Sequence, residues 1–318
     1  MASLLVIGGS GFFGKSILHS FSRGLLKKWK IEEIIILSRS ATQLKKNFPE
    51  LLSPEVKFLD LDISICTELP YADFVIHAAA STEANKYLIT GSNEHDNIIL
   101  ATKNFCRLSK VFFPNSKIIY VSSGAVYGVQ PVDILEIPES FNFNSSVNLM
   151  SASKIKYAIA KRESEKMIIE LSRNGAKTSI ARCFAFVGKY LPLDQHFAIG
   201  NFIKDGIAGD PLKVHAKNIV YRSYMYADDL VEWLLTILYF ASTNCPIFNV
   251  GSNEAIRIDY LAKIIAEKCS TTVSYLNQIE DFVDIYVPSI RLANQHGMKV
   301  KYNLDQSIEQ TLQFHSFA

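Results

Sequence analysis

The sequence predicts an α/β fold in which a doubly wound parallel sheet is joined by a smaller, mainly C-terminal domain. Two observations predict it. Short, continuously apolar runs alternate with segments of helical periodicity, and a glycine-rich turn follows the first of these runs. Strands of a parallel sheet are covered on both faces, which requires such continuous apolar runs. A β-α-β-α order then gives a sheet with helices on both sides.

Strand and helix patterns follow one another in order along most of the chain. The expected strands are 4–9, 33–38, 56–62, 73–80, 116–123 and 178–188, and the expected helices between them are 13–22, 94–110 and 152–173. A helix over 226–242 and a strand over 246–252 are expected to return to the sheet. We therefore expect residues 1–188, plus about 223–252, to form the sheet domain, and 189–222 with 253–318 to form the smaller one.

Bulk composition excludes several classes of protein. The chain has 318 residues, of which 48% are hydrophobic and 20% charged, and its net charge is +2. This charge gives no reason to expect nucleic acid or an anionic membrane as a partner. The apolar run 230–240 is too short to span a bilayer and carries Glu232, and the apolar start is expected to be a strand rather than a signal peptide.

The five cysteines indicate the cellular compartment. Their number is odd, they lie far apart, and no Cys-x-x-Cys pattern occurs. Structural disulfides and a metal site are therefore not expected, and the expected location is the reducing cytoplasm.

A glycine-rich turn, VIGGSGFFGKS, lies between the first strand and the first helix. Glycine is needed where the backbone turns tightly and where a pyrophosphate approaches main-chain N–H groups at a helix N-terminus. In the first β-α-β unit this spacing predicts a dinucleotide site, with a structural strand–helix turn as the alternative. The expected cofactor-binding residues of the turn are Gly8, Gly11, Phe12, Phe13 and Gly14.

The end of the second strand bears on which dinucleotide is bound. Enzymes that bind NAD(H) usually place an acidic residue there, to accept a hydrogen bond from the ribose 2′-hydroxyl. This chain has Ser38 and Arg39 instead. A guanidinium suits a 2′-phosphate, so NADP(H) is favoured over NAD(H), which stays open. The alternative is that Arg39 lies on a solvated loop.

Tyr157 and Lys161 are one helical turn apart in SASKIKYAIAKRESE. Their side chains can meet on one face, where a cation stabilises phenolate and lowers the tyrosine pKa below its ordinary value of about 10. Such a spacing arises about once by chance in a chain with 14 tyrosines and this many lysines. The pair therefore needs support from other motifs.

Further motifs accompany the glycine spacing and the tyrosine–lysine pair. They are DLDI (60–63), HAAA (77–80), VSSGAVYG (121–128), YAIAKRESE (157–165), RCFAFVG (182–188), RSYMYADDL (222–230) and HGMKVKYNLDQSIEQT (296–311). Together they resemble the extended short-chain dehydrogenase/reductase family of nucleotide-sugar epimerases, dehydratases and reductases. The resemblance covers almost the whole chain and implies a Rossmann-like dinucleotide-binding domain and a substrate domain.

The resemblance implies a catalytic set of Ser123, Tyr157 and Lys161. Ser123 would hydrogen-bond the sugar hydroxyl that is oxidised, and Tyr157 as phenolate would take its proton while hydride leaves for the nicotinamide. Lys161 would lower the tyrosine pKa and bind the nicotinamide ribose. Ser122 is the alternative for the catalytic hydroxyl, and packing is an equal alternative for Tyr127.

The resemblance also implies contacts beyond the catalytic set. Asp62 and Ile63 would lie beside the adenine, and Ala78, Ala79 and Ala80 beneath the cofactor, with His77 more structural than catalytic. Arg222 matches the arginine that grips the substrate diphosphate, unless it forms an ion pair with Asp228 or Asp229. Phe197 lies with His196 and Asn201 where relatives build the nucleotide-base pocket, although a helix packing on the sheet edge is as good an interpretation.

Two departures from the family pattern narrow the expected reaction. Sugar 4,6-dehydratases carry Asp-Glu after the catalytic hydroxyl, whereas this chain has Gly124 and Ala125, which hold no ionisable atoms. Ala185 stands where many epimerases have an asparagine that touches the substrate phosphate. The UDP-sugar specificity of those epimerases is therefore not assigned directly to this chain.

A 4-epimerase or 4-keto-reductase of a nucleotide-activated sugar is therefore the leading expectation. The alternatives are a dehydratase with a non-standard site and a non-catalytic NADP-binding sensor, although such sensors commonly lose the tyrosine or the lysine. The family often dimerises through the two helices that correspond to 94–110 and 152–173.

Overall fold

The computed structural model describes residues 2–80, 94–142, 150, 152–195, 197–277 and 280–316. Its centre is a seven-stranded sheet in the order β11-β6-β5-β4-β1-β2-β3. In chain order the strands are β1 (Ala2–Ile7), β2 (Ile31–Ser38), β3 (Val56–Asp60), β4 (Phe74–His77), β5 (Lys117–Ser123), β6 (Lys177–Cys183) and β11 (Ile247–Val250). This confirms the expected α/β class.

The order of the strands creates a switch point between β1 and β4. From β1 the chain runs outward through β2 to β3, and it then returns to place β4 on the other side of β1. The parallel register pairs Ile7 with both Leu37 and His77, so these strands end at one edge. Ligands of open α/β sheets bind beyond the carboxyl ends of strands at such a point.

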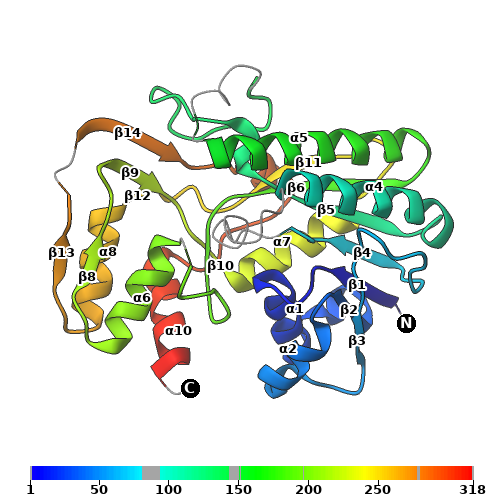
Figure 1. Cartoon of the computed structure of the whole chain (residues 1–318), viewed down its shortest axis with the longest axis horizontal. Helices are drawn as coiled ribbons and strands as arrows, with labels where there is room; N and C mark the ends of the chain where they lie inside the picture. The colour runs from blue at the N-terminus through cyan, green and yellow to red at the C-terminus, as the bar shows by residue number, and fades with distance from the viewer. Residues whose placement is uncertain are drawn as a thin grey trace. The chain divides into compact units, whose positions relative to one another are not determined.

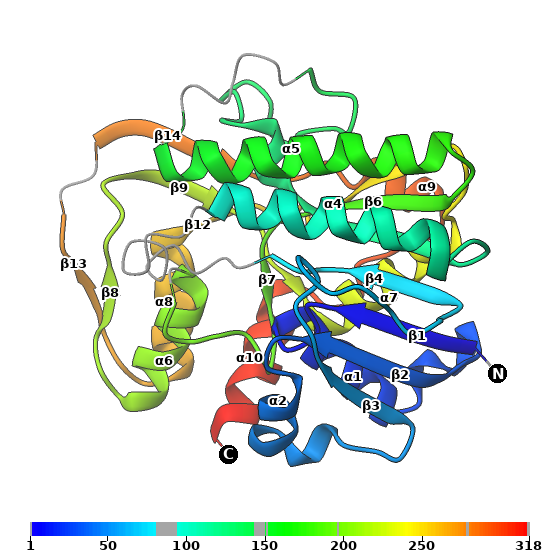
Figure 2. The ribbon, with the colours of Figure 1, turned by 45° about the vertical axis from the view of Figure 1, so that its right-hand side comes forward.

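Helices cover both faces of the sheet (Figures 1 and 2). The long helices α4 (Glu94–Phe112) and α5 (Ala152–Arg173) lie side by side on one face. On the other face lie α1 (Phe12–Ser22) and α7 (Ala227–Tyr239), where Lys28, just after α1, pairs with Glu232 at 2.7 Å. This part of the chain also contains one short α-helix, α2 (Ala41–Asn47), and the 3-10 helices η1 (Leu25–Trp29), η2 (Pro49–Leu51) and η3 (Gly124–Tyr127).

The chain divides into two compact units. The first contains Met1–Val126, Met150–Cys183 and Val231–Phe248, and the second contains Tyr127–Leu149, Phe184–Leu230 and Asn249–Ala318. The division after Cys183 precedes the expected boundary at 188, and the segment after Val126 groups with the second unit.

The second unit is built from short strands and helices. The strand expected over 178–188 is split, because β6 ends at Cys183 and Phe186–Val187 (β7) pairs with Met225–Tyr226 (β10) instead. The other elements are α6 (Ala198–Ala208), β8 (Leu212–Val214), β9 (Asn218–Arg222), β12 (Ile256–Arg257), α8 (Ile258–Lys268), β13 (Val273–Tyr275), β14 (Glu280–Tyr286), α9 (Arg291–Gln295) and α10 (Leu304–Ser316).

A buried carboxylate ties the start of α7 to the segment that precedes α10. Asp229 is 1% exposed, and its Oδ2 accepts the backbone N–H groups of Lys301 at 2.9 Å and Tyr302 at 3.1 Å. Two N–H donors satisfy an otherwise costly buried charge. In the part of the chain that is described, no helix combines the length and the apolar character needed to cross a bilayer.

Candidate active site

The glycine turn after β1 lies at the switch point. Gly8 has φ +83°, and a Cβ there would come within 2.7 Å of the Ala78 backbone. A Cβ on Gly14 would lie only 1.9 Å from the Gly9 carbonyl oxygen. Glycine is therefore required at both positions by close packing within the protein, at Gly8 against the end of β4 and at Gly14 between α1 and the turn.

Gly11 differs from these two glycines. It is exposed and caps α1 without a left-handed φ, and no side chain of a described residue caps this helix terminus. Among the described residues, a Cβ on Gly11 would meet only the Gly8 carbonyl oxygen, at 3.7 Å. The described packing gives no internal reason for glycine here, whereas a pyrophosphate approaching a helix N-terminus does. The turn thus fits a dinucleotide.

The ends of β2 and β3 present charges of both signs. Ser38 is buried and accepts the Ser40 N–H at 3.2 Å, while Arg39 is exposed. Asp60, the register partner of Ser38, accepts the Thr42 N–H at 2.8 Å, and hydrogen bonds from Thr42 lower the pKa of its carboxyl group. Asp60 was not among the residues expected at the site.

The remaining residues expected near the cofactor lie at the same edge of the sheet. Asp62 accepts the Ser64 N–H at 2.9 Å and its hydroxyl at 2.7 Å, which forms a turn. Ile63 is buried in the hydrophobic core, so its side chain is committed to packing. Ala78 donates its N–H to Ile7 at 2.8 Å, and Ala78, Ala79 and Ala80 are half-buried beside the turn.

Tyr157 and Lys161 come together on α5 as their spacing predicts. The Lys161 Nζ lies 5.9 Å from the centroid of the half-buried Tyr157 ring. Lys161 is only 2% exposed, and its ammonium donates to the Val121 carbonyl at 2.8 Å and to the Tyr120 hydroxyl at 3.3 Å. A buried ammonium is thus held beside the phenol by groups of β5.

The two serines at the end of β5 have different surroundings. Ser122 is buried, and its hydroxyl donates to Glu165 Oε1 at 2.6 Å. Ser123 is half-buried, and its Oγ accepts the Ala125 N–H at 3.2 Å. A hydroxyl that accepts one bond retains a proton to donate, so Ser123 is the better candidate for contact with a substrate oxygen.

His77 is fully buried at the end of β4. Neither ring nitrogen has a hydrogen-bond partner among the described residues, and the ring packs 4.5 Å from Phe105 and 5.5 Å from Tyr120 between centroids. Its pKa is lowered from 6.5 to about 3, because burial disfavours the charged ring and the Lys161 ammonium repels it. A neutral ring in the core agrees with a structural role.

Arg222, in the second unit, forms an ion pair that the sequence did not indicate. Its Nη2 bonds the Asp284 carboxylate of β14 at 2.7 Å, and its guanidinium lies 5.8 Å from the centroid of Tyr286. The alternative that named Asp228 or Asp229 as its partner was wrong. Arg222 and Asp284 lie on neighbouring parallel strands, 62 residues apart in sequence.

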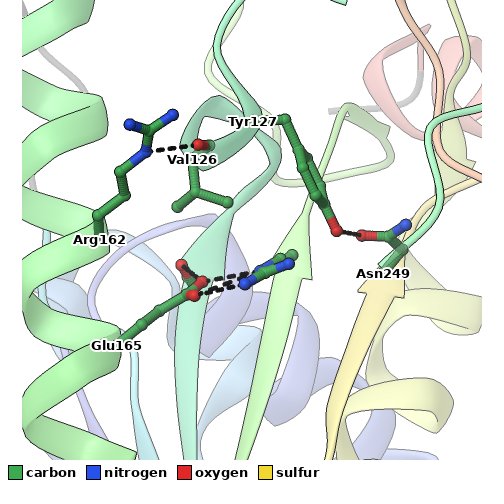
Figure 3. A network of polar contacts seen from close by, with 7 residues as sticks. Val126, Tyr127, Arg162, Glu165 and Asn249 are labelled. Carbon is green, nitrogen blue, oxygen red and sulfur yellow. Dashed lines mark hydrogen bonds and ion pairs between the residues drawn. The ribbon is translucent and has the colours of Figure 1, made fainter. Parts of the chain in front are cut away.

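Phe197 and Tyr127 also belong to the second unit. Phe197 is half-buried at the start of α6, where its carbonyl accepts the Asn201 N–H at 3.0 Å; His196 lies outside the described residues. Tyr127 is 1% exposed, and its hydroxyl donates to Asn249 at 2.7 Å (Figure 3). This bond favours the packing interpretation of Tyr127.

A buried ion pair beside the catalytic candidates was not predicted. Arg182 of β6 bonds Glu165 of α5 at 2.8 Å between Nη2 and Oε2, and both side chains are about 5–6% exposed. The spacing of Glu165 from Lys161 placed it on the same helix face, but nothing local in the sequence indicates its arginine partner. In the described parts of the chain, no three His, Cys, Asp or Glu side chains gather as metal ligands would.

Comparisons by sequence identify a family and distant relatives. The profile of the NAD dependent epimerase/dehydratase family matches residues 4–251. UDP-glucuronic acid decarboxylase 1 of Arabidopsis thaliana is 26% identical over 267 residues, which cover 83% of this chain and 58% of that protein. UDP-glucuronic acid decarboxylase 1 of Xenopus tropicalis is 22% identical over 318 residues, covering 98% of this chain and 71% of its own length.

Comparisons of structure find the same fold in nucleotide-sugar enzymes. A UDP-N-acetylglucosamine 4-epimerase of Methanobrevibacter ruminantium superposes with a TM-score of 0.82 at 19% identity, covering 99% of this chain and 98% of that one. A dTDP-glucose 4,6-dehydratase of Streptomyces venezuelae with bound NAD gives 0.80 at 19% identity, with 98% and 96% covered. At these identities the likeness concerns the fold alone.

Proposed function

Because this chain belongs to the NAD dependent epimerase/dehydratase family, we propose that it oxidises or reduces C4, or a neighbouring carbon, of a nucleotide-activated sugar. The reaction would be that of a 4-epimerase or a keto-reductase. The observation that carries this proposal is the buried Lys161 ammonium, held 5.9 Å from the Tyr157 ring centroid at the end of the sheet that bears the glycine turn.

Each residue of the catalytic set has a part that its surroundings support. Tyr157 as phenolate takes the proton of the sugar hydroxyl, and as phenol returns it in the reverse direction; such acid–base catalysis contributes about 10²–10⁴-fold. Lys161 favours the phenolate by its charge. Ser123 donates a hydrogen bond to the same oxygen and orients it. The bound dinucleotide supplies hydride acceptance and donation.

We also propose that the protein prefers NADP(H) to NAD(H), because the exposed guanidinium of Arg39 lies at the end of β2. A 2′-phosphate would gain charge-assisted hydrogen bonds from it. Asp60 at the end of β3 acts in the opposite sense, because its carboxylate repels a phosphate. The preference therefore depends on the balance of these two side chains.

Decarboxylation of a nucleotide sugar is the second candidate function. It is favoured by the similarity of this chain to UDP-glucuronic acid decarboxylases. Elimination of water from C5 and C6 needs a base and an acid, which Gly124 and Ala125 cannot supply. Decarboxylation of a hexuronic acid differs, because oxidation at C4 makes the carboxyl group a β-keto acid. Carbon dioxide then leaves with the bonding electrons delocalised onto the C4 oxygen, and a proton returns to C5.

The proposed partners are the nucleotide sugar and a second copy of the chain. Arg222 would bind the substrate diphosphate through its planar donor fork. A homodimer would form through α4 and α5, and α4 exposes two large apolar side chains, Leu100 at 53% and Val111 at 70%. Burial of such side chains in a dimer would be favourable.

Product analysis by mass spectrometry and proton NMR tests the proposal. UDP-glucose, UDP-N-acetylglucosamine, dTDP-glucose and UDP-glucuronate are each incubated with the protein and NAD⁺ or NADP⁺, and a 4-keto sugar with NADPH. Epimer or reduced sugar supports the leading proposal, pentose from UDP-glucuronate supports the second, and a 4-keto-6-deoxy sugar contradicts the argument from Gly124 and Ala125.

The matched control is Tyr157→Phe, which removes the proton acceptor and keeps the ring. It is expected to lower turnover by about 10²–10⁴-fold while cofactor still binds. Dinucleotide binding without turnover of any sugar would instead support a non-catalytic sensor.

A further inference from the structure

Three successive contacts tie α5 to the segment that carries Ser123. Lys161 Nζ donates to the Val121 carbonyl at 2.8 Å, and Arg162 Nε donates to the Val126 carbonyl at 2.7 Å. Ser122, which lies between Val121 and Val126 in sequence, donates its hydroxyl to Glu165 Oε1 at 2.6 Å. Figure 3 shows Arg162 and Glu165 reaching from α5 toward this segment. Ser123 thus lies between anchored residues on both sides.

Arg182 extends these contacts to a second strand. Ser122 and Arg182 are register partners on β5 and β6, and Arg182 bonds both oxygens of Glu165, with Nε at 3.1 Å from Oε1 and Nη2 at 2.8 Å from Oε2. One carboxylate therefore fixes α5 against the ends of two neighbouring strands. Its oxygens are engaged by charged and hydroxyl donors, as a buried carboxylate requires.

Stability alone is a weak reason for this arrangement. Removing one member of a buried ion pair is strongly destabilising, yet replacing the whole pair by apolar side chains is often neutral. An apolar replacement would no longer fix the orientation of these groups, because the hydrogen bonds from Ser122 and Arg182 to the Glu165 carboxylate set angles that aliphatic contacts do not. Catalysis is sensitive to such placement, since a shift of about 1 Å can lower turnover by about 10²-fold.

We propose that Glu165, Arg182 and Ser122, together with Arg162, are positioning residues that hold the Ser123 hydroxyl in register with Tyr157. This inference rests on the proposed function, because it assigns the network to the alignment of a reacting oxygen. Cofactor affinity belongs to the glycine turn and Lys161, so the network governs turnover and leaves dinucleotide binding in place.

The kinetic test compares four variants with the parent protein. Glu165→Gln weakens the network, and Arg162→Met removes the contact to Val126 from a half-buried position. The triple variant Ser122→Ala, Glu165→Leu, Arg182→Met replaces the charges by apolar groups. Glu170→Gln is the matched control, since Glu170 is exposed on α5, where its carboxylate pairs with Arg173 at 3.4 Å and accepts the Asn174 amide at 3.2 Å.

The proposal expects Glu165→Gln and Arg162→Met to lower kcat by about 10–100-fold, with the KM for the sugar and the Kd for the dinucleotide changed less than threefold. The triple variant should recover the parent Tm and keep the low kcat. Glu170→Gln should behave as the parent. A triple variant that recovers both Tm and kcat overturns the proposal, because the network would then be structural only.

Hydrogen exchange of backbone amides separates this inference from the proposed function, since it needs no substrate. Glu165→Gln should accelerate exchange at 121–126 at least tenfold, and exchange in β1 and β2 should stay as in the parent. Unchanged exchange at 121–126, or equal acceleration throughout the first unit, overturns the proposal. If the parent turns over no sugar, the proposed function fails, and these rates still decide whether the network fixes the segment.

Discussion

The glycine turn of the first unit and the Arg222 strand of the second, the two candidate anion sites, differ in how their surroundings are built. Around the turn, close backbone packing at Gly8 and Gly14 shapes the chain, and a Cβ at Gly11 would touch only Gly8 among the described residues. On β9, by contrast, the Arg222 guanidinium is already bonded to Asp284 at 2.7 Å. A phosphate can approach the first without displacing a carboxylate, but it must compete with one at the second.

This difference teaches how each of the two candidate anion sites would respond to a ligand. A backbone site is fixed by the fold, so binding there needs little rearrangement. A side-chain site that is neutralised by its own partner must exchange that partner, so its affinity is a difference between two similar bonds. Seven substitutions test this comparison and the residues around the two sites.

The largest expected effect separates two glycines of the same turn. Gly14→Ala brings a methyl group to 1.9 Å from the Gly9 carbonyl oxygen, which should lower the free energy of unfolding by about 3 kcal/mol. Gly11→Ala should change it by only about 0.5 kcal/mol yet weaken dinucleotide binding at least tenfold, by blocking the pyrophosphate. Urea denaturation and titration calorimetry measure the two quantities. Normal dinucleotide affinity in Gly11→Ala would falsify the comparison.

The next effect concerns the competition at Arg222. Arg222→Met removes charged hydrogen bonds worth about 1.5–3 kcal/mol, so the affinity for UDP should fall roughly 10–100-fold. Asp284→Asn removes the competing charge, and UDP should then bind several-fold more tightly. Calorimetry with UDP measures both, and Asp284→Asn is the informative control. Equal weakening by both substitutions would mean that the ion pair serves only to pack β9 against β14.

The third effect tests the charges beside the adenosine ribose. Arg39→Ala should weaken NADP binding about tenfold or more and leave NAD nearly unchanged, because only NADP carries the 2′-phosphate. Asp60→Asn, at the neighbouring strand end, should strengthen NADP binding instead. Equal affinity of the parent protein for NADP and NAD, measured by calorimetry, would contradict the role given to Arg39.

The effect expected to be smallest at neutral pH is a pH dependence of stability that originates in His77. The unfolded chain takes up a proton near 6.5, whereas folded His77 does so only near 3. The unfolded state therefore binds more protons between these values, and the free energy of unfolding falls as pH decreases, by about 1.4 kcal/mol per unit from this group.

His77→Leu should remove that part of the slope. Urea denaturation between about pH 7 and pH 5 measures it, and pH 7 serves as the reference because the histidine is then mostly neutral in both states. A variant with the same slope as the parent would show that His77 is not buried as a neutral ring.

The features that the sequence could predict depend on neighbours along the chain. The strands, the glycine turn and the meeting of Tyr157 with Lys161 follow from periodicity and spacing within a few residues. The partner of Arg222 lies 62 residues away on a strand of seven residues, and the named alternatives, Asp228 and Asp229, were merely the acidic residues closest in sequence.

The second unit resisted prediction for a related reason. Three of its strands, β7, β10 and β12, have only two residues each, which is too few for an alternating pattern to appear. The pairing of Arg182 with Glu165 likewise joins a strand to a helix, so only the fold brings them together. Residues that act together within one motif could be predicted from the sequence, whereas ion pairs between residues distant in sequence could not.

The bonds that Asp229 accepts from Lys301 and Tyr302 set an order of events during synthesis. These donors follow the carboxylate by 72 and 73 residues, so they leave the ribosome well after it. Until then, burying Asp229 would leave a charge without its N–H donors, which is unfavourable. The surroundings of Asp229 are therefore completed only after residue 302 has been synthesised, whereas the strands of the central sheet, the last of which ends at Val250, are present earlier.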